Sequence, residues 1–112
     1  MPAQVPEVSI AETKRLLDGA NPPRLVDVRE VDEWEHCKIP GAELLPLSQW
    51  PALAQEKLAD KSQPLLLHCH HGGRSARATA WLLQQGYTDV RNVAGGIDAW
   101  SLEIDPGVPR YE

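Results

Sequence analysis

The sequence contains no phenylalanine, one methionine and two cysteines, and no apolar run in it approaches the length of a membrane span. Two cysteines do not make a disulfide framework, so a small fold held together by disulfides is excluded. Lysine and arginine form no run and the formal net charge is −5, which argues against nucleic acid or an anionic membrane as a general partner. Residues 1–6 have neither a basic nor an apolar region. We therefore expect a soluble, cytoplasmic protein.

Short apolar runs alternate with helical patterns along the chain, whose 112 residues are enough to bury a core. Residues 1–112 are therefore expected to form a single domain. Strands are expected at 24–29, 43–46, 65–67 and 89–93, and helices at 9–18, 30–35, 49–58 and 75–85. Residues 94–100 are expected to form a turn, and residues 102–112 to lie over the surface. Strands that alternate with helices give a parallel α/β fold, and right-handed crossovers place the helices on both faces of the sheet.

One stretch, Leu-Leu-Leu-His-Cys-His-His-Gly-Gly-Arg-Ser at 65–75, joins a predicted strand to a reactive side chain. The leucine run predicts a strand that is buried on both faces. Cys69 then lies at the carboxyl end of this strand, and ligands bind at that edge of open α/β sheets. Gly72 and Gly73 allow a tight turn, and Ser75 followed by alternating alanines predicts the start of a helix.

The turn after Cys69 predicts a binding site for a negatively charged group. Successive backbone N–H groups of the turn and the first free N–H groups of the helix point into one small volume. The same donors stabilise a thiolate, so the pKa of Cys69 is expected to fall below its ordinary value. Arg74 adds positive charge and can bind an oxyanion through two donors. The predicted site thus has Cys69 and Arg74 as catalytic residues, and a substrate-binding loop formed by His70, His71, Gly72, Gly73 and Ser75.

Several residues near this site have two interpretations each. Asp27 interrupts a buried strand, so its carboxylate needs a partner, either a cation such as Arg74 or backbone donors at the sheet edge. The alternative for Asp27 is a plain capping role in a turn. Cys37 is either a structural residue or a resolving thiol that forms a disulfide with Cys69. The two loop histidines either titrate near neutrality to assist the reaction or are solvated loop residues.

Four motifs, taken together, resemble those of the single-domain rhodanese family of sulfurtransferases. They are Asp-Val-Arg-Glu at 27–30, Ile-Pro-Gly-Ala at 39–42, the Cys-to-Ser stretch at 69–75, and Gly-Gly-Ile at 95–97 with Trp100. The resemblance covers nearly the whole chain, although Lys38 stands where the family often has a histidine. It implies a rhodanese-like fold, a compact five-stranded parallel sheet with helices on both faces. Within the first motif, Asp27 and Arg29 are candidate supporting residues.

The resemblance also implies a sulfur transfer in two steps through Cys69. The thiolate would attack the outer, sulfane sulfur of a donor such as thiosulfate, expel sulfite and keep the sulfur as a persulfide. An acceptor, cyanide or a thiol, would then remove that sulfur, which gives ping-pong kinetics. No metal or organic cofactor is required. A sulfur-relay protein is a further candidate partner, whereas nucleic acid and membranes are not.

Three alternatives to a sulfurtransferase are considered for the same residues. Cysteine phosphatases and arsenate reductases also place arginine and serine after a His-Cys pair, but this loop is one residue shorter than theirs and suits a single sulfur atom better than a phosphate. A carrier module would accept sulfur from a partner protein through the same Cys69. A metal site at His68, Cys69, His70 and His71 is disfavoured, because adjacent residues at the end of a strand point in different directions.

Overall fold

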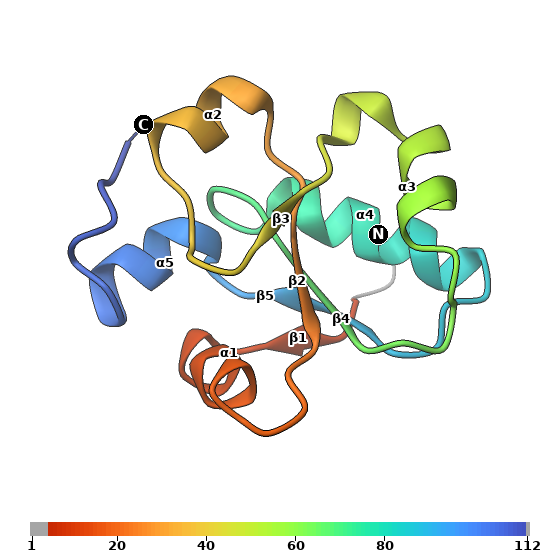
Figure 1. Ribbon diagram of the computed structural model, residues 1–112, viewed down its shortest axis with the longest axis horizontal. Coiled ribbons are helices and arrows are strands. Elements are labelled where there is room, and N and C mark those ends of the chain that lie inside the picture. Colours follow the sequence, from red (N-terminus) through yellow and green to blue (C-terminus); the bar gives the residue numbers. More distant parts are fainter. Residues whose placement is uncertain (1–4, 112) are drawn as a thin grey trace.

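The computed structural model describes residues 5–111 and shows a five-stranded sheet between two layers of helices (Figure 1). All strand pairs are parallel, and the strand order is β1-β5-β4-β2-β3. The strands are β1 (Glu7–Val8), β2 (Arg24–Asp27), β3 (Glu43–Leu44), β4 (Leu65–His68) and β5 (Val90–Val93). The five-stranded parallel sheet is thus confirmed, and β1 is an edge strand that the sequence analysis did not locate.

The helices agree with the predicted segments in the first half of the chain and less well in the second. They are α1 (Ile10–Leu17), α2 (Val31–His36), α3 (Ala52–Lys57), α4 (Gly73–Gln84) and α5 (Gly96–Glu103), with a 3-10 turn at Leu47–Gln49. The helix predicted at 49–58 is therefore shorter, and α5 occupies part of a predicted turn. In the part of the chain that the structure describes, no helix is both long and apolar enough to cross a membrane.

Local signals explain where α1 and α4 begin. The Ser9 side chain accepts a hydrogen bond from the Glu12 N–H at 3.0 Å, as expected for an N-terminal cap. Helix α4 begins at Gly73 rather than at Ser75, because Gly72 takes a φ of 114° and ends the preceding turn there. Ser75 consequently lies inside the first turn of α4, not before it.

The sheet separates two apolar layers, and β4 contributes side chains to both of them. Leu65 and Leu67 pack in the layer that contains Ala54 of α3 and Ala78 of α4, whereas Leu66 packs in the layer that contains residues of α1 and α5. Successive residues of a strand point to opposite faces, so a strand covered on both sides must be apolar throughout. The predicted placement of helices on both faces is confirmed, with α1 and α5 on one face and α3 and α4 on the other (Figure 1).

The start of α5 fixes the loop that follows β4. The Ile97 N–H donates to the Cys69 carbonyl at 2.9 Å, and the Asp98 N–H donates to the His70 carbonyl at 3.1 Å. This approach requires glycine at position 96, where φ is +58° and an added Cβ would lie 2.3 Å from the Cys69 carbonyl oxygen. Helix α5 thus sets the path of the backbone at Cys69 and His70.

We expect Gly96→Ala to lower the free energy of unfolding more than Gly41→Ala, as measured by urea denaturation. Both glycines have a positive φ, but an added Cβ at Gly41 meets nothing within 4 Å. The control variant therefore carries only the backbone strain, about 1–2 kcal/mol. The collision at Gly96 should add about 1–3 kcal/mol to that cost. Equal costs for the two variants would contradict the close approach of α5 to the Cys69 loop.

Candidate active site

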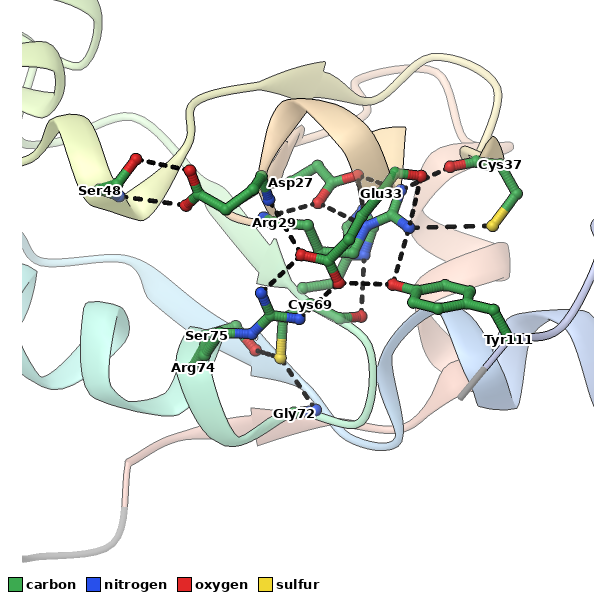
Figure 2. A network of polar contacts seen from close by, with 12 residues as sticks. Asp27, Arg29, Glu33, Cys37, Ser48, Cys69, Gly72, Arg74, Ser75 and Tyr111 are labelled. Atoms are coloured by element: carbon green, nitrogen blue, oxygen red, sulfur yellow. Dashed lines mark hydrogen bonds and ion pairs between the residues drawn. The ribbon is translucent and has the colours of Figure 1, made fainter. Parts of the chain in front are cut away.

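Cys69 directly follows β4, and its sulfur lies within the turn that leads into α4 (Figure 2). The Sγ atom accepts a hydrogen bond from the Gly72 N–H at 3.1 Å and lies 3.4 Å from the Ser75 hydroxyl oxygen. That hydroxyl also lies 2.5 Å from Asn92 Oδ1, so its single proton serves one of the two acceptors at a time. The structure therefore brings two of the predicted loop residues, Gly72 and Ser75, into contact with the sulfur.

The turn lowers the pKa of the Cys69 thiol, in the direction that the sequence predicts. Burial of the side chain raises this pKa, because a thiolate is less stable away from water. Hydrogen bonds outweigh that effect: the Ser75 hydroxyl and the backbone N–H groups of Ser75, Gly72 and Arg74 all stabilise the thiolate. Since a thiolate is a far better nucleophile than a thiol, the turn makes Cys69 a candidate nucleophile.

Arg74 is not free to bind an anion with its two terminal nitrogens. Both donate to the carboxylate of Glu33 on α2, each at 2.7 Å (Figure 2). Hydrogen bonds from Arg74 are the main reason why the pKa of Glu33 falls to about 2. The pair therefore joins α2 to α4 beside Cys69, a connection that the sequence analysis did not predict.

Asp27 pairs with Arg29 and not with Arg74, and the alternative of a capping role in a turn is confirmed, because the Arg29 backbone N–H also donates to Asp27 Oδ1 at 3.0 Å. Both side chains are fully buried, and Arg29 Nη2 lies 2.7 Å from Asp27 Oδ2. Arg29 also donates to the carbonyl of Cys37 at 2.7 Å. His68 Nε2 lies 3.7 Å from the same carboxylate, and burial holds the pKa of His68 below its ordinary value. The charge of Asp27 is thus balanced by an arginine only two residues away.

Tyr111 connects these ion pairs to the loop after Cys69. Its hydroxyl donates to Glu33 at 2.8 Å and accepts from Arg29 at 3.0 Å, and burial raises the pKa of Tyr111 to about 12. Its ring stacks on His70 with 3.9 Å between the ring centroids. The expectation that residues 102–112 lie over the surface holds for most of those up to 111, but Val108 is buried and Tyr111 is half-buried, and residue 112 lies outside the described residues.

A hollow of about 430 Å³ opens beside the Cys69 turn. It is lined by Cys69, His70, His71, Gly73, Arg74 and Arg77. Arg77 was not among the predicted site residues, although it lies one helical turn after Arg74. It is exposed, and among residues 5–111 it has no ion pair or side-chain hydrogen bond. The hollow therefore contains a nucleophile, two imidazoles and an available cation.

The protein-family model that describes the rhodanese-like domain matches residues 9–103 of this sequence. The chain belongs to the rhodanese-like domain family. It is 34% identical over 103 residues to the thiosulfate sulfurtransferase GlpE of Pseudoalteromonas translucida, which covers 92% of this chain and 95% of that protein. The structure of the human single-domain sulfurtransferase TSTD1 has a TM-score of 0.74 and 32% identity, over 88% of this chain and 96% of that one.

A longer relative carries the same kind of sequence as one part of its length. The chain is 41% identical over 91 residues to the Rhodanese-like/PpiC domain-containing protein 12, chloroplastic, of Arabidopsis thaliana. The match covers 79% of this chain and spans 30% of that protein. The rhodanese-like family thus includes proteins of about this length and proteins several times longer.

The metal site considered at residues 68–71 of this rhodanese-like chain does not form, because His68 is fully buried beside Asp27. A different group does come together: ligand atoms of His70, His71 and Asp98 lie within 4.8 Å of one another. The two imidazole rings stack, with 3.9 Å between their centroids and 24° between their planes. Asp98 is also held by Arg110 at 2.9 Å.

Cys37 lies on the opposite side of the rhodanese-like sheet from Cys69. It packs in the layer of α1 and α5, whereas Cys69 packs in the layer of α3 and α4. Both thiols are free and buried, and the Cys37 sulfur lies 3.8 Å from Arg29 Nη1. This placement favours the structural interpretation of Cys37 over that of a resolving thiol.

Sequence reasoning missed Glu33, Tyr111 and Arg77 for different reasons. A helix next to the 27–30 motif was predicted, so an acidic residue on it was a reasonable candidate partner for an arginine. Arg77 lies at helical spacing from Arg74, and this spacing was a usable signal. Tyr111 is one of only two tyrosines, but nothing else in the sequence marks it. Its partners Arg29, Glu33 and His70 all lie more than 40 positions away in the chain.

We expect the Cys69 thiol to titrate below the value of about 8.5 of free cysteine. The pH dependence of its alkylation rate, measured in a Cys37→Ser background, gives the midpoint. Ser75→Ala should raise that midpoint by about one pH unit or less, because one of several donors is lost and its proton is shared with Asn92. Cys69→Ser supplies the baseline. A parent midpoint at or above the free value would contradict the role of the turn.

We expect Arg29→Met to lower the free energy of unfolding by about 3–5 kcal/mol, because it leaves the buried Asp27 carboxylate without its cation. Arg24→Met is the matched control, since Arg24, at the start of β2, also pairs with a carboxylate, that of Glu43, but at a partly exposed site. Its cost should be about 1 kcal/mol or less. Urea denaturation compares the two, and equal costs would show that the buried pair is not a main support of the fold.

Proposed function

We propose that this chain is a sulfurtransferase that moves a sulfane sulfur from an anionic donor such as thiosulfate to a thiol or to cyanide, through a persulfide on Cys69. One observation carries the proposal: the Cys69 sulfur accepts the Gly72 N–H inside a turn of backbone donors that faces a hollow with an available arginine. The similarity to a thiosulfate sulfurtransferase over 95% of that protein supports the same chemistry.

In the first step, the Cys69 thiolate attacks the outer sulfur of thiosulfate. A sulfur–sulfur bond forms to Cys69, the bond to the central sulfur breaks, and sulfite leaves with the electron pair. The terminal sulfur of the persulfide then carries the negative charge. The N–H groups of Gly72, Arg74 and Ser75, which already lower the pKa of the thiol, are placed to stabilise it.

In the second step, the thiolate of an acceptor, or cyanide, attacks the terminal sulfur of the persulfide. The sulfane sulfur passes to the acceptor, and the Cys69 thiolate leaves with the electron pair, ready for another donor. The two steps balance without an oxidant or a reductant, and they require no metal or organic cofactor. His70 and His71 line the path into the hollow, where they contact the donor or acceptor.

The two arginines of the hollow have different parts in this proposal. Arg74, paired with Glu33, fixes the start of α4 relative to α2. The buried pair of Asp27 and Arg29 supports the same arrangement. Arg77 is the cation that attracts and orients the anionic donor. The role expected for Arg74 is therefore divided: Arg74 positions the turn through its ion pair with Glu33, and Arg77 supplies the charge that the donor meets.

A carrier module is the second candidate, because a similar sequence forms 30% of a longer relative in Arabidopsis thaliana. Such a module would receive sulfur on Cys69 and pass it to a partner protein. Its chemistry at Cys69 is the same, so only turnover separates the two functions. A sulfurtransferase turns over rapidly with thiosulfate and a small acceptor, whereas a carrier turns over poorly with small donors and forms its persulfide readily from a partner protein.

We expect the reduced protein to gain the mass of one sulfur atom after incubation with thiosulfate, as measured by intact mass. Cys69→Ser should gain none, and Cys37→Ser should gain the same mass as the parent, because Cys37 lies on the other side of the sheet. Addition of cyanide should remove the extra mass and yield thiocyanate. Unchanged mass of the parent, with a free Cys69 thiol, would overturn thiosulfate as donor and direct attention to other sulfur donors and to phosphate esters.

A further inference from the structure

The chain after α5 returns to the site, and its last described residue, Tyr111, lies beyond the residues 9–103 that match the rhodanese-like domain. We call residues 104–111 the C-terminal segment. Val108 of this segment is buried in the layer of α1 and α5, and its carbonyl accepts a hydrogen bond from the Ser101 hydroxyl. Arg110 pairs with Asp98 of α5 at 2.9 Å. The segment is therefore fixed before it reaches Tyr111.

Tyr111 contacts three parts of the chain around the Cys69 turn. Its hydroxyl donates to Glu33 of α2 at 2.8 Å and accepts from Arg29, which follows β2, at 3.0 Å (Figure 2). Its ring stacks on His70, in the loop after β4, with 3.9 Å between the centroids and 8° between the planes. A single side chain of the C-terminal segment thus joins the loop that carries the nucleophile to α2 and to the end of β2.

The ring of Tyr111 fixes the imidazole of His70 at the hollow beside Cys69. Tyr111 and His71 both stack on this imidazole, each with 3.9 Å between centroids, so the two rings lie on opposite faces of it. The His71 side chain is 69% exposed, whereas Tyr111 is held at its far end by the contacts of its hydroxyl. His70 therefore takes its orientation from Tyr111 rather than from His71.

The hydroxyl of Tyr111 connects the two ion pairs of the site. Glu33 accepts hydrogen bonds from both terminal nitrogens of Arg74 and from Tyr111. The same hydroxyl accepts a hydrogen bond from Arg29, which pairs with the buried Asp27. Burial raises the pKa of Tyr111 to about 12, so the hydroxyl keeps the proton that it donates. Loss of the hydroxyl would remove this side-chain connection between the two pairs.

We propose, on the basis of the sulfur transfer proposed above, that Tyr111 is a positioning residue of this site. Its ring orients His70 toward the donor or the acceptor, and its hydroxyl holds Glu33 in place for Arg74. Tyr111 does not itself line the hollow, so it acts through these residues. The C-terminal segment thereby contributes to a site that is built around the Cys69 turn.

The titration of His70 reports the stacking directly. Burial is the main reason why the pKa of His70 lies below its ordinary value. Tyr111→Ala removes the ring, whereas Tyr111→Phe keeps it. We therefore expect Tyr111→Ala to raise the pKa of His70 toward about 6.5 and Tyr111→Phe to leave it unchanged, as measured by NMR titration and assigned with His70→Ala. Both variants keep the titratable and charged groups around the imidazole, which are His71, Asp98, Glu33, Cys69 and Arg74.

Activity measures the consequence for sulfur transfer, with thiosulfate as donor, cyanide as acceptor and thiocyanate as the product. We expect Tyr111→Ala to lower kcat/KM by about two- to tenfold, as the loss of one aromatic pair does, and Tyr111→Phe to lower it less. In a His70→Ala background, Tyr111→Ala should cause no further loss relative to Tyr111→Phe, because the ring acts through His70.

Two further variants control for stability. Tyr87→Phe is the matched control for Tyr111→Phe, because the Tyr87 hydroxyl is also bonded, to the carbonyl of Leu58, but in the layer of α3 and α4. It should leave kcat/KM unchanged, so a loss confined to Tyr111→Phe measures the contact with Glu33. Tyr111→Leu, which keeps an apolar side chain, replaces Tyr111→Ala in every measurement if the alanine variant does not fold.

Three results would overturn this inference while the proposed sulfur transfer stands. They are an unchanged pKa of His70 in Tyr111→Ala, full activity of Tyr111→Ala or of His70→Ala, and losses that simply multiply when those two substitutions are combined. The titration of His70 needs no donor, so it tests the stacking whatever the reaction is. A parent protein that forms no persulfide with any sulfur donor would instead overturn the proposed function itself.

Discussion

The buried ion pair between Asp27 and Arg29 is the interaction on which the arrangement of the site depends. A fully buried carboxylate is tolerated only with a partner, and Arg29 supplies it while its remaining donors reach the Cys37 carbonyl and the Tyr111 hydroxyl. The pair thus fixes the chain on both sides of α2. Helix α2 in turn presents Glu33 to Arg74, so the position of the helix that follows the Cys69 turn is set by a charge pair on the neighbouring strand.

This arrangement separates two requirements of thiolate chemistry. The turn stabilises negative charge on Cys69 with short-range N–H donors, which act whatever ligand is present. In the proposed sulfur transfer, attraction of an anionic donor needs a cation that is free to contact it, and we assign that part to Arg77 on the next turn of α4, since both terminal nitrogens of Arg74 are engaged by Glu33. Activation of the nucleophile and recognition of the substrate can therefore be altered independently.

Much of the fold was predictable because its signals are local. The run Leu65–Leu67 is apolar on both faces because helices cover both faces of the sheet, and the serine cap marks the start of α1 within a few residues of the chain. Strand β1 was missed because two residues carry no periodicity, and it is a strand only through its pairing with β5. Helix α5 was taken for a turn because its glycines, which serve a close approach to the Cys69 carbonyl, are ordinary turn residues.

The sequence by itself determined the parallel α/β fold, the position of Cys69 at the end of a central strand and the lowered pKa of its thiol, because each depends on residues adjacent in the chain. Only the tertiary structure decided that Asp27 pairs with Arg29, that Glu33 pairs with Arg74, that Tyr111 stacks on His70, and that Arg77 lines both the hollow beside Cys69 and a second hollow with Trp50 and Trp81. A charged side chain pairs with the nearest opposite charge, and the packing of the helices and strands, not the order of the residues, determines which charge is nearest.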